Sequence, residues 1–394
     1  MIACQFWNSA VFAVGLAVAW IGHGGLVLFV LNRIYAQPWP RYLLRSVRLF
    51  LGLVVLALPV LWWSLWGWNM PAPRVYSHAA WPVFGVAYIG ICMVLGVVAV
   101  PCALVLKWRL RKPGVLRSNH TETVDVPAEL GWRPLGRGQH RWMVGLPGND
   151  IFRVDCNVKT VSLHGLPSAW DGLSILHLSD LHLRGIPDKA FYAHILERCQ
   201  RWQPDLVALT GDVVDSHHHH RWIVPLLGRL RWRIAAFAVL GNHDYYHDPL
   251  LVRRRLRRVG FHVLGNRWTQ LDVHGLPLIV VGHEGPWFCP EPDLSSCPAG
   301  PFRLCLSHTP DNLPWCQRHG IGLMLAGHNH GGQIRLPGIG SLFVPSTFGR
   351  RYDAGLFDEP PTLLHVSRGL AGKQPLRINC RPEVSLLVLK RTEI

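Results

Sequence analysis

At 394 residues the chain is long enough to carry one catalytic domain and an additional module. Its hydrophobic fraction of 49% and its 18 tryptophans are high for a soluble enzyme, and the apolar residues concentrate near the N-terminus. The net charge of +16 is compatible with binding to nucleic acid, with binding to anionic lipid, or with solubility alone. The ten cysteines include no C-x-x-C pair, which argues against a zinc finger and suits a reducing compartment.

The first 112 residues predict a transmembrane region. Three runs without Lys, Arg, Asp or Glu reach the length of roughly 20 residues that a helix needs to cross a bilayer. They occupy residues 9–31, 50–68 and 82–106. Buried core helices are the alternative interpretation, but three such runs in succession favour membrane insertion. No Lys or Arg precedes the first run, so we expect it to be retained rather than cleaved as a signal peptide.

Basic residues beside the three runs predict the orientation of the chain. The first loop and its edges hold Arg33, Arg41, Arg45 and Arg48, whereas the second loop holds only Arg74. A further basic segment, residues 107–117, follows the third run. Because Lys and Arg are enriched in cytoplasmic loops, three spans place the N-terminus outside and the catalytic domain in the cytoplasm. An arrangement with two spans would break this agreement.

Residues 113–150 are predicted to form a linker and the edge of the next domain, because they are rich in Gly, Pro, Arg and Trp and lack a clear period. Their Arg133, Arg137 and Arg141 would be attracted to acidic headgroups, so membrane lipid is an expected partner. We expect no specific nucleic-acid partner, since no nucleic-acid-binding module accompanies the positive charge.

Residues 151–394 predict an α+β domain. The stretch 151–163 has the pattern of an edge strand, and strands then alternate with helical segments at 189–202, 222–230 and 249–259. The last quarter of the chain is rich in strands. This order predicts two sheets packed together with helices outside them.

Five short polar clusters follow strand-like apolar runs in this domain. In chain order they are Asp180-Leu181-His182, Gly211-Asp212, Gly241-Asn242-His243-Asp244, Ser307-His308 and Gly327-His328-Asn329-His330. One cluster alone would be ordinary, as a capping Asp, a turn Asn or a hydrogen-bonded His. Five clusters in order, all expected at strand ends where a sheet gathers ligands, predict a two-metal phosphoesterase site.

The residue types indicate how a first ion would be held. Asp180 and His182 are two residues apart, so on an extended strand end both side chains would point to one ion. Asp212 follows a strand and a glycine, and its carboxylate has two oxygens with which to bridge two ions. Gly211 would supply the tight turn that bridging requires.

The remaining clusters would complete a second ion and supply a proton. Asn242, His308 and His328 offer oxygen and nitrogen ligands to the second ion, and His330 would return to the first. His243 would protonate the leaving group, while Asp244 would orient that ring or a neighbouring ligand. Mixed Asp, His and Asn ligands suit Mn, Fe, Zn or Co as the two divalent cofactors.

From about Leu173 onward the chain resembles the calcineurin-like metallophosphoesterases, most closely their bacterial membrane-associated branch. The segments that carry the resemblance are SDLH, GDVVD, GNHDYY, LSHTPD, AGHNHGGQIRLP and RGL...PLRINCRPEVSLL. It implies a four-layer αββα sandwich, a bacterial-type inner membrane location, and His243 as the proton donor. The metal ligands that it implies are Asp180, His182, Asp212, Asn242, His308, His328 and His330.

The segment Gly282-His283-Glu284 departs from this branch, which often has a Gly followed by acidic residues, so the substrate-side loop stays open. Arg335, Arg350 and Arg351 flank the last cluster and are predicted to grip phosphate, with surface salt bridges as the alternative. The run from His217 to His220 is predicted to form an exposed rim rather than an accessory metal site. Cys289 and Cys297 are expected to be free thiols unless the domain is exported.

The sequence therefore predicts a membrane-anchored two-metal phosphohydrolase that cleaves a phosphoester or a pyrophosphate. Some members of the resembled branch hydrolyse the pyrophosphate of UDP-2,3-diacylglucosamine, which makes a lipid-linked nucleotide the leading specific substrate. The rival interpretation is a non-catalytic membrane receptor or scaffold that binds a phosphorylated ligand. Competent residues at every ligand position disfavour that rival.

Overall fold

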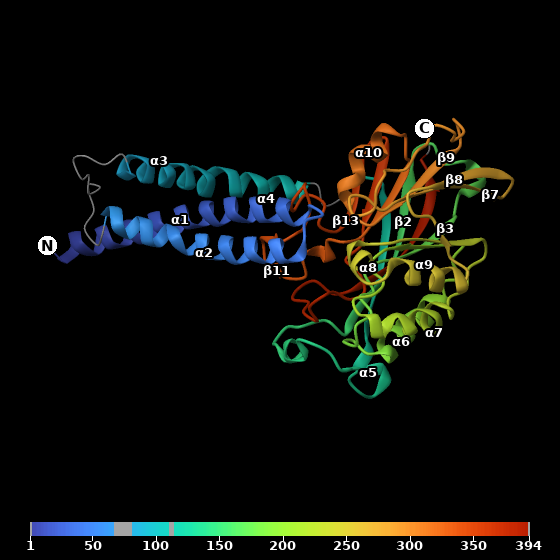
Figure 1. Cartoon of the computed structure of the whole chain (residues 1–394). Coiled ribbons are helices and arrows are strands. Elements are labelled where there is room, and N and C mark those ends of the chain that lie inside the picture. Colours follow the sequence, from blue (N-terminus) through green and yellow to red (C-terminus); the bar gives the residue numbers. More distant parts are fainter. Residues whose placement is uncertain (1, 67–80, 110–113, 393–394) are drawn as a thin grey trace. The chain divides into compact units, whose positions relative to one another are not determined.

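The computed structural model describes residues 2–66, 81–109 and 114–392, and it divides into two units, Met1–Leu110 and Arg111–Ile394. The described part of the first unit is helical (Figure 1). Its elements are α1 (Ile2–Tyr35), α2 (Arg41–Trp66), α3 (Trp81–Val94), a π-helical turn (Leu95–Ala99) and α4 (Val100–Arg109).

Three helical segments of the first unit are long and apolar enough to cross a membrane, which indicates a multi-pass membrane protein. They are Ala10–Tyr35, Arg41–Leu65 and Val83–Val105. The second helix begins at Arg41, before the predicted run of residues 50–68, and residues 67–68 lie outside the described part. The early start places Arg41, Arg45 and Arg48 within the helix, where long basic side chains can extend toward the headgroups.

A buried histidine ties the helices of this unit together. His23 on α1 is only 2% exposed, and its two ring nitrogens are hydrogen-bonded to the Tyr88 hydroxyl of α3 at 2.6 Å and the Val54 carbonyl of α2 at 2.8 Å. Because a polar group in an apolar surrounding needs partners, these two contacts stabilise the packing of the three helices.

The second unit contains two mixed sheets (Figure 1). The first has the order β1 (Leu116–Asp125), β2 (Arg153–Leu163), β15 (Glu383–Arg391), β3 (Ser174–Leu178), β4 (Leu206–Thr210), β5 (Ala235–Val239) and β6 (His262–Val263). The second has the order β13 (Gly355–Glu359), β14 (Thr362–Val366), β10 (Leu323–Ala326), β9 (Phe302–Ser307), β8 (Leu276–His283) and β7 (Trp268–Val273). A small ribbon pairs β11 (Arg335–Leu336) with β12 (Gly340–Ser341).

Three apolar cores join these sheets and the helices into layers. Side chains such as Phe237 of β5 and Leu325 of β10 fill the space between the two sheets. Helices pack on the outer face of the first sheet through residues such as Phe191, and Trp315 packs on the outer face of the second. The helices are α5 (Val126–Leu130), α6 (Lys189–Gln200), α7 (Ile223–Leu227), α8 (Asn242–Tyr246), α9 (Pro249–Arg258) and α10 (Leu313–Arg318). The predicted αββα sandwich is confirmed.

Two details of the predicted fold differ from the structure. The stretch expected as a linker contains β1, which pairs antiparallel with β2, so β2 is an interior strand rather than the predicted edge strand. The sequence of β1 is polar and its side chains are largely exposed, so it lacks the alternation that identifies a half-buried strand.

Cys289 and Cys297 are free thiols, as expected.

The parallel parts of the two sheets determine where the polar clusters lie. β3, β4 and β5 are parallel neighbours in the first sheet, and β9 and β10 are parallel neighbours in the second. Each predicted cluster follows the carboxyl end of one of these five strands. Since carboxyl ends of parallel strands share one edge of a sheet, the fold gathers the clusters into one region.

Candidate metal centre

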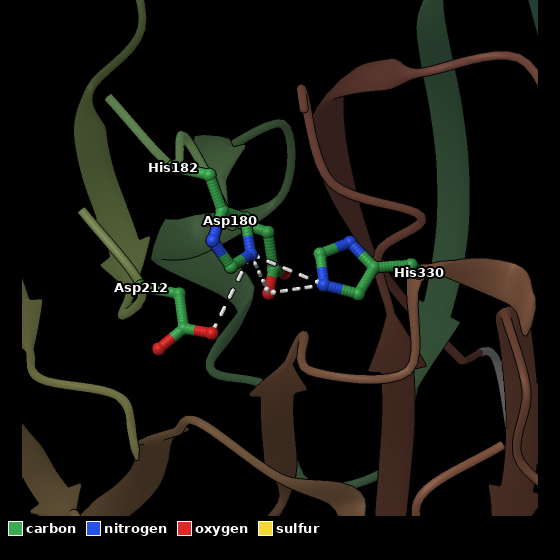
Figure 2. Close-up of side chains that lie close together, drawn as sticks. All are labelled: Asp180, His182, Asp212 and His330. Atoms are coloured by element: carbon green, nitrogen blue, oxygen red, sulfur yellow. Dashed lines mark hydrogen bonds and ion pairs between the residues drawn. The ribbon is translucent and has the colours of Figure 1, made fainter. Parts of the chain in front are cut away.

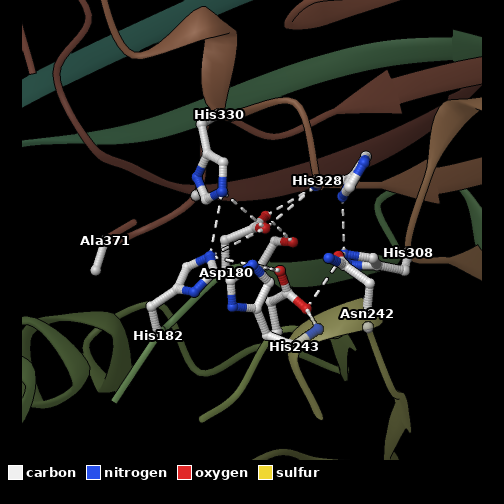
Figure 3. A network of polar contacts seen from close by, with 12 residues as sticks. Asp180, His182, Asn242, His243, His308, His328, His330 and Ala371 are labelled. Atoms are coloured by element: carbon white, nitrogen blue, oxygen red, sulfur yellow. Dashed lines mark hydrogen bonds and ion pairs between the residues drawn. The ribbon is translucent and has the colours of Figure 1, made fainter. Parts of the chain in front are cut away.

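Three groups of His and Asp side chains lie close enough together to hold metal ions (Figures 2 and 3). They are Asp180 with His182, Asp212 and His330; Asp212 with His308 and His328; and His182 with Asp215 and His243. Asp212 belongs to the first two groups, which makes it the centre of the arrangement.

In the first group the four side chains converge from three loops, those after β3, β4 and β10 (Figure 2). His182 Nε2 lies 3.8 Å from Asp180 Oδ1, 3.5 Å from Asp212 Oδ2 and 3.1 Å from His330 Nε2. His330 Nε2 lies 3.6 Å from the same oxygen of Asp180. The side chains are buried except for that of His330, which is partly exposed, so one side of the group is accessible to solvent.

The second group uses the other oxygen of Asp212, and Figure 3 shows its members His308 and His328 beside Asn242. Asp212 Oδ1 lies 3.3 Å from His308 Nε2, which in turn lies 3.2 Å from His328 Nδ1 and 3.0 Å from Asn242 Oδ1. Asp212 therefore offers one oxygen to each group, which is the geometry of a bridging carboxylate.

The donor set fits two divalent ions. Imidazole nitrogens face each other at 3.1 Å in the pair His182–His330 and at 3.2 Å in the pair His308–His328. In each pair at least one of the two facing nitrogens carries a lone pair rather than a hydrogen, so it can serve as a metal ligand. The carboxylate oxygens of Asp180 and Asp212 lie close to these nitrogens. Nitrogen and carboxylate ligands gathered in this way suit transition metals such as Mn, Fe, Zn and Co.

The backbone at the candidate ligands is unusual. Asp180, His182, Asp212, His328 and His330 have φ angles between 43° and 68°, in the left-handed region that non-glycine residues rarely adopt. The expectation that Asp180 and His182 occupy an extended strand end is wrong, since β3 ends at Leu178. Hydrogen bonds between loops hold the two residues instead: the N–H groups of Asp180 and His182 donate to the carbonyls of Gly211 and Asp212. Such strain is typical of functional sites.

Gly327 permits the loops to approach closely. A Cβ atom added there would lie 1.9 Å from Ser179 Oγ and 2.3 Å from Asp180 Oδ2, so a side chain would displace the carboxylate. The absence of a side chain lets the His328 N–H donate to both oxygens of Asp180. This glycine is therefore part of the geometry that positions Asp180.

His243 is oriented by a residue that sequence reasoning missed. Asp215 Oδ1 is hydrogen-bonded to His243 Nδ1, and Asp215 Oδ2 lies 3.1 Å from His182 Nδ1. The predicted partner Asp244 instead accepts hydrogen bonds from the N–H groups of Val213, Val214 and Gly241, so it shapes the loops rather than the imidazole. Asp215 stands three residues after Asp212 in the GDVVD segment, and that spacing was the available signal.

The buried charges shift one another's protonation. Burial opposes ionisation of both His308 and Asp212, but their mutual attraction raises the pKa of His308 to about 9 and holds that of Asp212 well below its ordinary value. Burial raises the pKa of Asp180. Burial also raises the pKa of Asp215, but His243 and His182 outweigh it and keep that carboxyl ionised. These shifts are typical of a site that concentrates opposite charges in a low-dielectric environment.

The three arginines predicted to grip phosphate each have a partner within the domain. Arg335 lies 3.3 Å from Asp353, Arg350 donates to the Ile339 carbonyl, and Arg351 lies 2.8 Å from Glu359. The contacts of Arg335 and Arg351 are ion pairs, as in the alternative interpretation, whereas Arg350 forms a hydrogen bond to a backbone carbonyl.

The histidine run lies outside the metal groups. His217 and His218 are exposed, and His220 is buried with Nε2 hydrogen-bonded to the His247 carbonyl. Across the described residues this run contributes no cluster that could hold an ion. The run is exposed at its first two residues, partly exposed at His219 and buried at His220.

Two further residues contact the site without having been predicted. The ring of Trp287 lies 5.5 Å from that of His308 and 5.0 Å from that of His328, between centroids, and is partly exposed. Arg377 is fully buried and donates to the His330 carbonyl at 2.9 Å. Both come from segments without strand-end clusters, so only the tertiary structure reveals them.

Comparison with known proteins agrees with this geometry. A family model described as calcineurin-like phosphoesterase matches residues 173–332. The chain is 33% identical over 222 residues to the phosphodiesterase YaeI of Escherichia coli, covering 55% of this chain and 81% of the relative. It is 29% identical over 252 residues to the uncharacterized metallophosphoesterase YkuE of Bacillus subtilis, covering 61% and 86%.

A third relative extends the similarity toward the N-terminus. The chain is 27% identical over 343 residues to a Bos taurus transmembrane protein with metallophosphoesterase domain, covering 81% of this chain and 74% of the relative. A match of that length exceeds residues 111–394 and reaches into the helical unit.

Proposed function

Because the chain belongs to the calcineurin-like phosphoesterase family and is a metal-dependent phosphoesterase, we propose that it is a membrane-anchored two-metal phosphohydrolase that acts on a lipid-linked phosphoester or pyrophosphate. The observation that carries this proposal is Asp212, whose two oxygens face two separate groups of ligands. When bound, two divalent ions would activate water and neutralise charge on the phosphoryl oxygens.

Seven side chains would hold the ions. Asp180, His182, Asp212 and His330 would hold the first, and Asp212, Asn242, His308 and His328 the second. Asp212 would contribute to both sites. The left-handed backbone at five of the seven keeps their side chains fixed before substrate binds; these five are Asp180, His182, Asp212, His328 and His330. Arg377 would hold the loop of His330 in place through its hydrogen bond to the His330 carbonyl.

His243 would deliver a proton to the leaving oxygen. Its Nε2 lies 4.0 Å from Asp212 Oδ2 and so borders the predicted metal centre, while Nδ1 contacts Asp215. A carboxylate at Nδ1 fixes the orientation of the ring, which leaves Nε2 as the proton-donating atom. Departure of the leaving group then returns the ring to its neutral form.

Two features support a substrate at the bilayer. The helical unit holds three candidate spans. In addition, Ile334, Leu336 and Ile339 of the β11–β12 ribbon are 37–39% exposed, soon after the ligand His330 in the chain, and Arg335 and Arg350 lie beside them. Exposed apolar residues next to basic ones suit contact with lipid. We further propose a cytoplasmic catalytic domain, from the basic segments that flank the spans.

Hydrolysis by the detergent-purified full chain with Mn²⁺ tests the proposal. The substrates are bis(p-nitrophenyl) phosphate and UDP-2,3-diacylglucosamine, and the variants are His243→Ala and Asp212→Ala. Asp171→Ala serves as a control, because Asp171 is an exposed carboxylate paired with Lys390. We expect cleavage of both substrates, lost in the two site variants and retained in the control.

The two substrates separate the parts of the proposal. Cleavage of the artificial diester alone would keep the two-metal chemistry and refute this lipid-linked substrate. Absence of metal-dependent turnover with either substrate would refute the phosphohydrolase and favour a receptor for a phosphorylated ligand.

A further inference from the structure

A cavity of about 510 Å³ lies beside the loop that carries Asn242 and His243. It is lined by α9, by the turn at residues 263–267 after β6, and by the loop at residues 284–290 after β8. None of the predicted metal ligands lines it. The volume is within the range of sites for small ligands, which bury groups of nucleotide or headgroup size.

The charges that line this cavity are unbalanced. Arg253, Arg257 and Arg267 contribute three positive charges, and Glu284 is the one acidic residue among the lining side chains. Glu284 is fully buried and its carboxylate is occupied: it accepts hydrogen bonds from both terminal nitrogens of Arg253 and from the Leu240 N–H. Arg253 is therefore neutralised inside the protein.

The other two arginines remain available. Arg257 and Arg267 are exposed, and neither forms an ion pair within the described residues. They reach the cavity from separate elements, Arg257 from the last turn of α9 and Arg267 from the turn before β7. Two guanidinium groups that converge from different elements can bind a phosphate from two sides with paired hydrogen bonds.

An aromatic ring and a network of hydrogen bonds also line the cavity. Phe288 lines the cavity, and the Arg253 guanidinium lies 5.2 Å from the centre of its ring. Asn266 locks the two loops together: its amide donates to the carbonyls of Phe288 and Pro290, and its oxygen accepts from the Glu284 N–H. A frame fixed in this way lowers the cost of ordering when a ligand binds.

The cavity also contacts the segment that carries the candidate proton donor. Glu284 accepts from Leu240, which directly precedes Gly241 and Asn242. On the same side, the ring of Phe288 packs against Tyr245 with 5.2 Å between centroids, two residues after His243. A ligand in the cavity would thus lie next to the catalytic loop without contacting the ions.

We propose that this cavity is a second anion site, which binds a phosphate-bearing group through Arg257 and Arg267. Phosphate is the shared chemistry of two possible sources: a soluble pyrophosphate or nucleotide, and the headgroup of an anionic lipid. The site is separate from the metal centre, so its existence does not depend on the proposed hydrolysis.

Cys289 gives a direct readout of occupancy. It is an exposed free thiol that lines the cavity, whereas Cys297 on the same loop is a free thiol that does not line it. The rates at which a thiol reagent labels the two residues are measured by mass spectrometry on the full chain in detergent, with increasing inorganic pyrophosphate. The series is run with Mn²⁺ and again with EDTA, because binding at the cavity does not need the metal ions.

We expect pyrophosphate to slow labelling of Cys289, but not of Cys297, under both conditions. The double variant Arg257→Ala/Arg267→Ala should need at least about tenfold more pyrophosphate for the same protection, since it loses the charge-assisted contacts. Arg254→Ala/Arg258→Ala is the control, because it removes the same number of positive charges at exposed positions of α9 that do not line the cavity. The single change Arg267→Glu, on the turn, tests the site if the double variant folds poorly.

Nanodiscs identify the source of the phosphate. Protection of Cys289 in discs containing phosphatidic acid, but not in phosphatidylcholine alone, would support the site with a lipid headgroup as ligand. Protection by pyrophosphate alone would support it with a soluble ligand. Failure of every probe to protect Cys289, or equal loss of protection in the variants of both arginine pairs, would overturn the proposal.

Discussion

Replacement of Asp215 by Asn tests how the candidate proton donor is controlled. The carboxylate contacts His243 Nδ1 with one oxygen and lies 3.1 Å from His182 Nδ1 with the other. Asn has nearly the same shape but lacks the charge, and one of its two terminal atoms is a donor. It can therefore accept from one imidazole N–H, while its NH₂ group faces the other.

The size of the effect follows from these two contacts. A hydrogen bond to a charged group contributes about 1.5–3 kcal/mol. If loss of the contact to His243 is expressed fully in the transition state, kcat falls by roughly ten- to 150-fold, because each 1.36 kcal/mol changes a rate tenfold. Loss of the contact to His182, a predicted ligand, would weaken metal binding by a further factor of about 10 or more.

The assay is hydrolysis of bis(p-nitrophenyl) phosphate over a range of Mn²⁺ concentrations, so that the two losses separate. We expect kcat at saturating Mn²⁺ to fall while KM changes little, and the Mn²⁺ concentration at half-maximal rate to rise. Asp171→Asn removes an exposed carboxylate and should behave as wild type. A kcat within twofold of wild type at saturating metal would refute the idea that Asp215 orients the proton donor.

Three further predictions follow from the same structure. Gly327→Ala should abolish high-affinity metal binding, measured by metal content after gel filtration, because the added Cβ would lie 2.3 Å from Asp180 Oδ2. Glu383→Gln should destabilise the fold at pH 7 by about 3 kcal/mol, because it removes a buried carboxylate that lies 2.8 Å from Arg368 and 3.8 Å from Lys159 Nζ. Arg368 would then have Asp155 as its remaining carboxylate partner. Trp287→Ala should raise KM for an aromatic diester by roughly two- to tenfold with a smaller change in kcat, because a ring beside the ligands can stack on the substrate.

The pH dependence of the Glu383 variant has a definite sign. Burial raises the pKa of Glu383, but Arg368 and Lys159 outweigh it and hold the pKa well below its ordinary value. A carboxyl whose pKa is lower in the folded state stabilises the fold above its unfolded pKa and loses that effect as the pH falls toward its folded pKa. The difference in Tm between wild type and variant should therefore narrow below about pH 4.5. A difference that grows on acidification would contradict this reasoning.

Each of the other two predictions has a matched control. Gly145→Ala adds a Cβ with no atom within 4 Å and should leave metal content unchanged; if Gly327→Ala also retains its metal, the close approach is not essential. Trp287→Phe keeps an aromatic ring and should recover most of the affinity. An unchanged KM in Trp287→Ala would exclude a role for this ring in substrate binding.

The sequence predicted the positions of the clusters better than their geometry. Asp180, Asp212 and His308 each follow an apolar run, and such a run can be recognised from the local sequence alone. Because the strands that these runs form are parallel, their carboxyl ends bring the three residues together. The left-handed backbone at Asp180 depends instead on a hydrogen bond to Gly211, which is distant in sequence. Local patterns do not contain that information.

The residues that were missed share a physical reason. Arg377 and Trp287 contact the site from segments far along the chain from the residues they touch, and neither has a distinctive spacing. The strand β1 was hidden for a different reason, since an exposed polar edge strand resembles a loop in composition. Arg377, Trp287 and β1 are all defined by contacts between separate structural elements, and the local sequence does not reveal such contacts.

The position of β15 has a consequence for biosynthesis. This strand enters the first sheet between β2, to which it is parallel, and β3, whose carboxyl end leads to Asp180. Residues 383–391 leave the ribosome after every candidate ligand, so the sheet that supports the site cannot close while the chain is still being translated through them. The apolar helices at the other end emerge much earlier and are available for insertion by the translocon. If the three apolar helices insert as they emerge, the predicted metal centre would assemble on a polypeptide that is already held at the membrane.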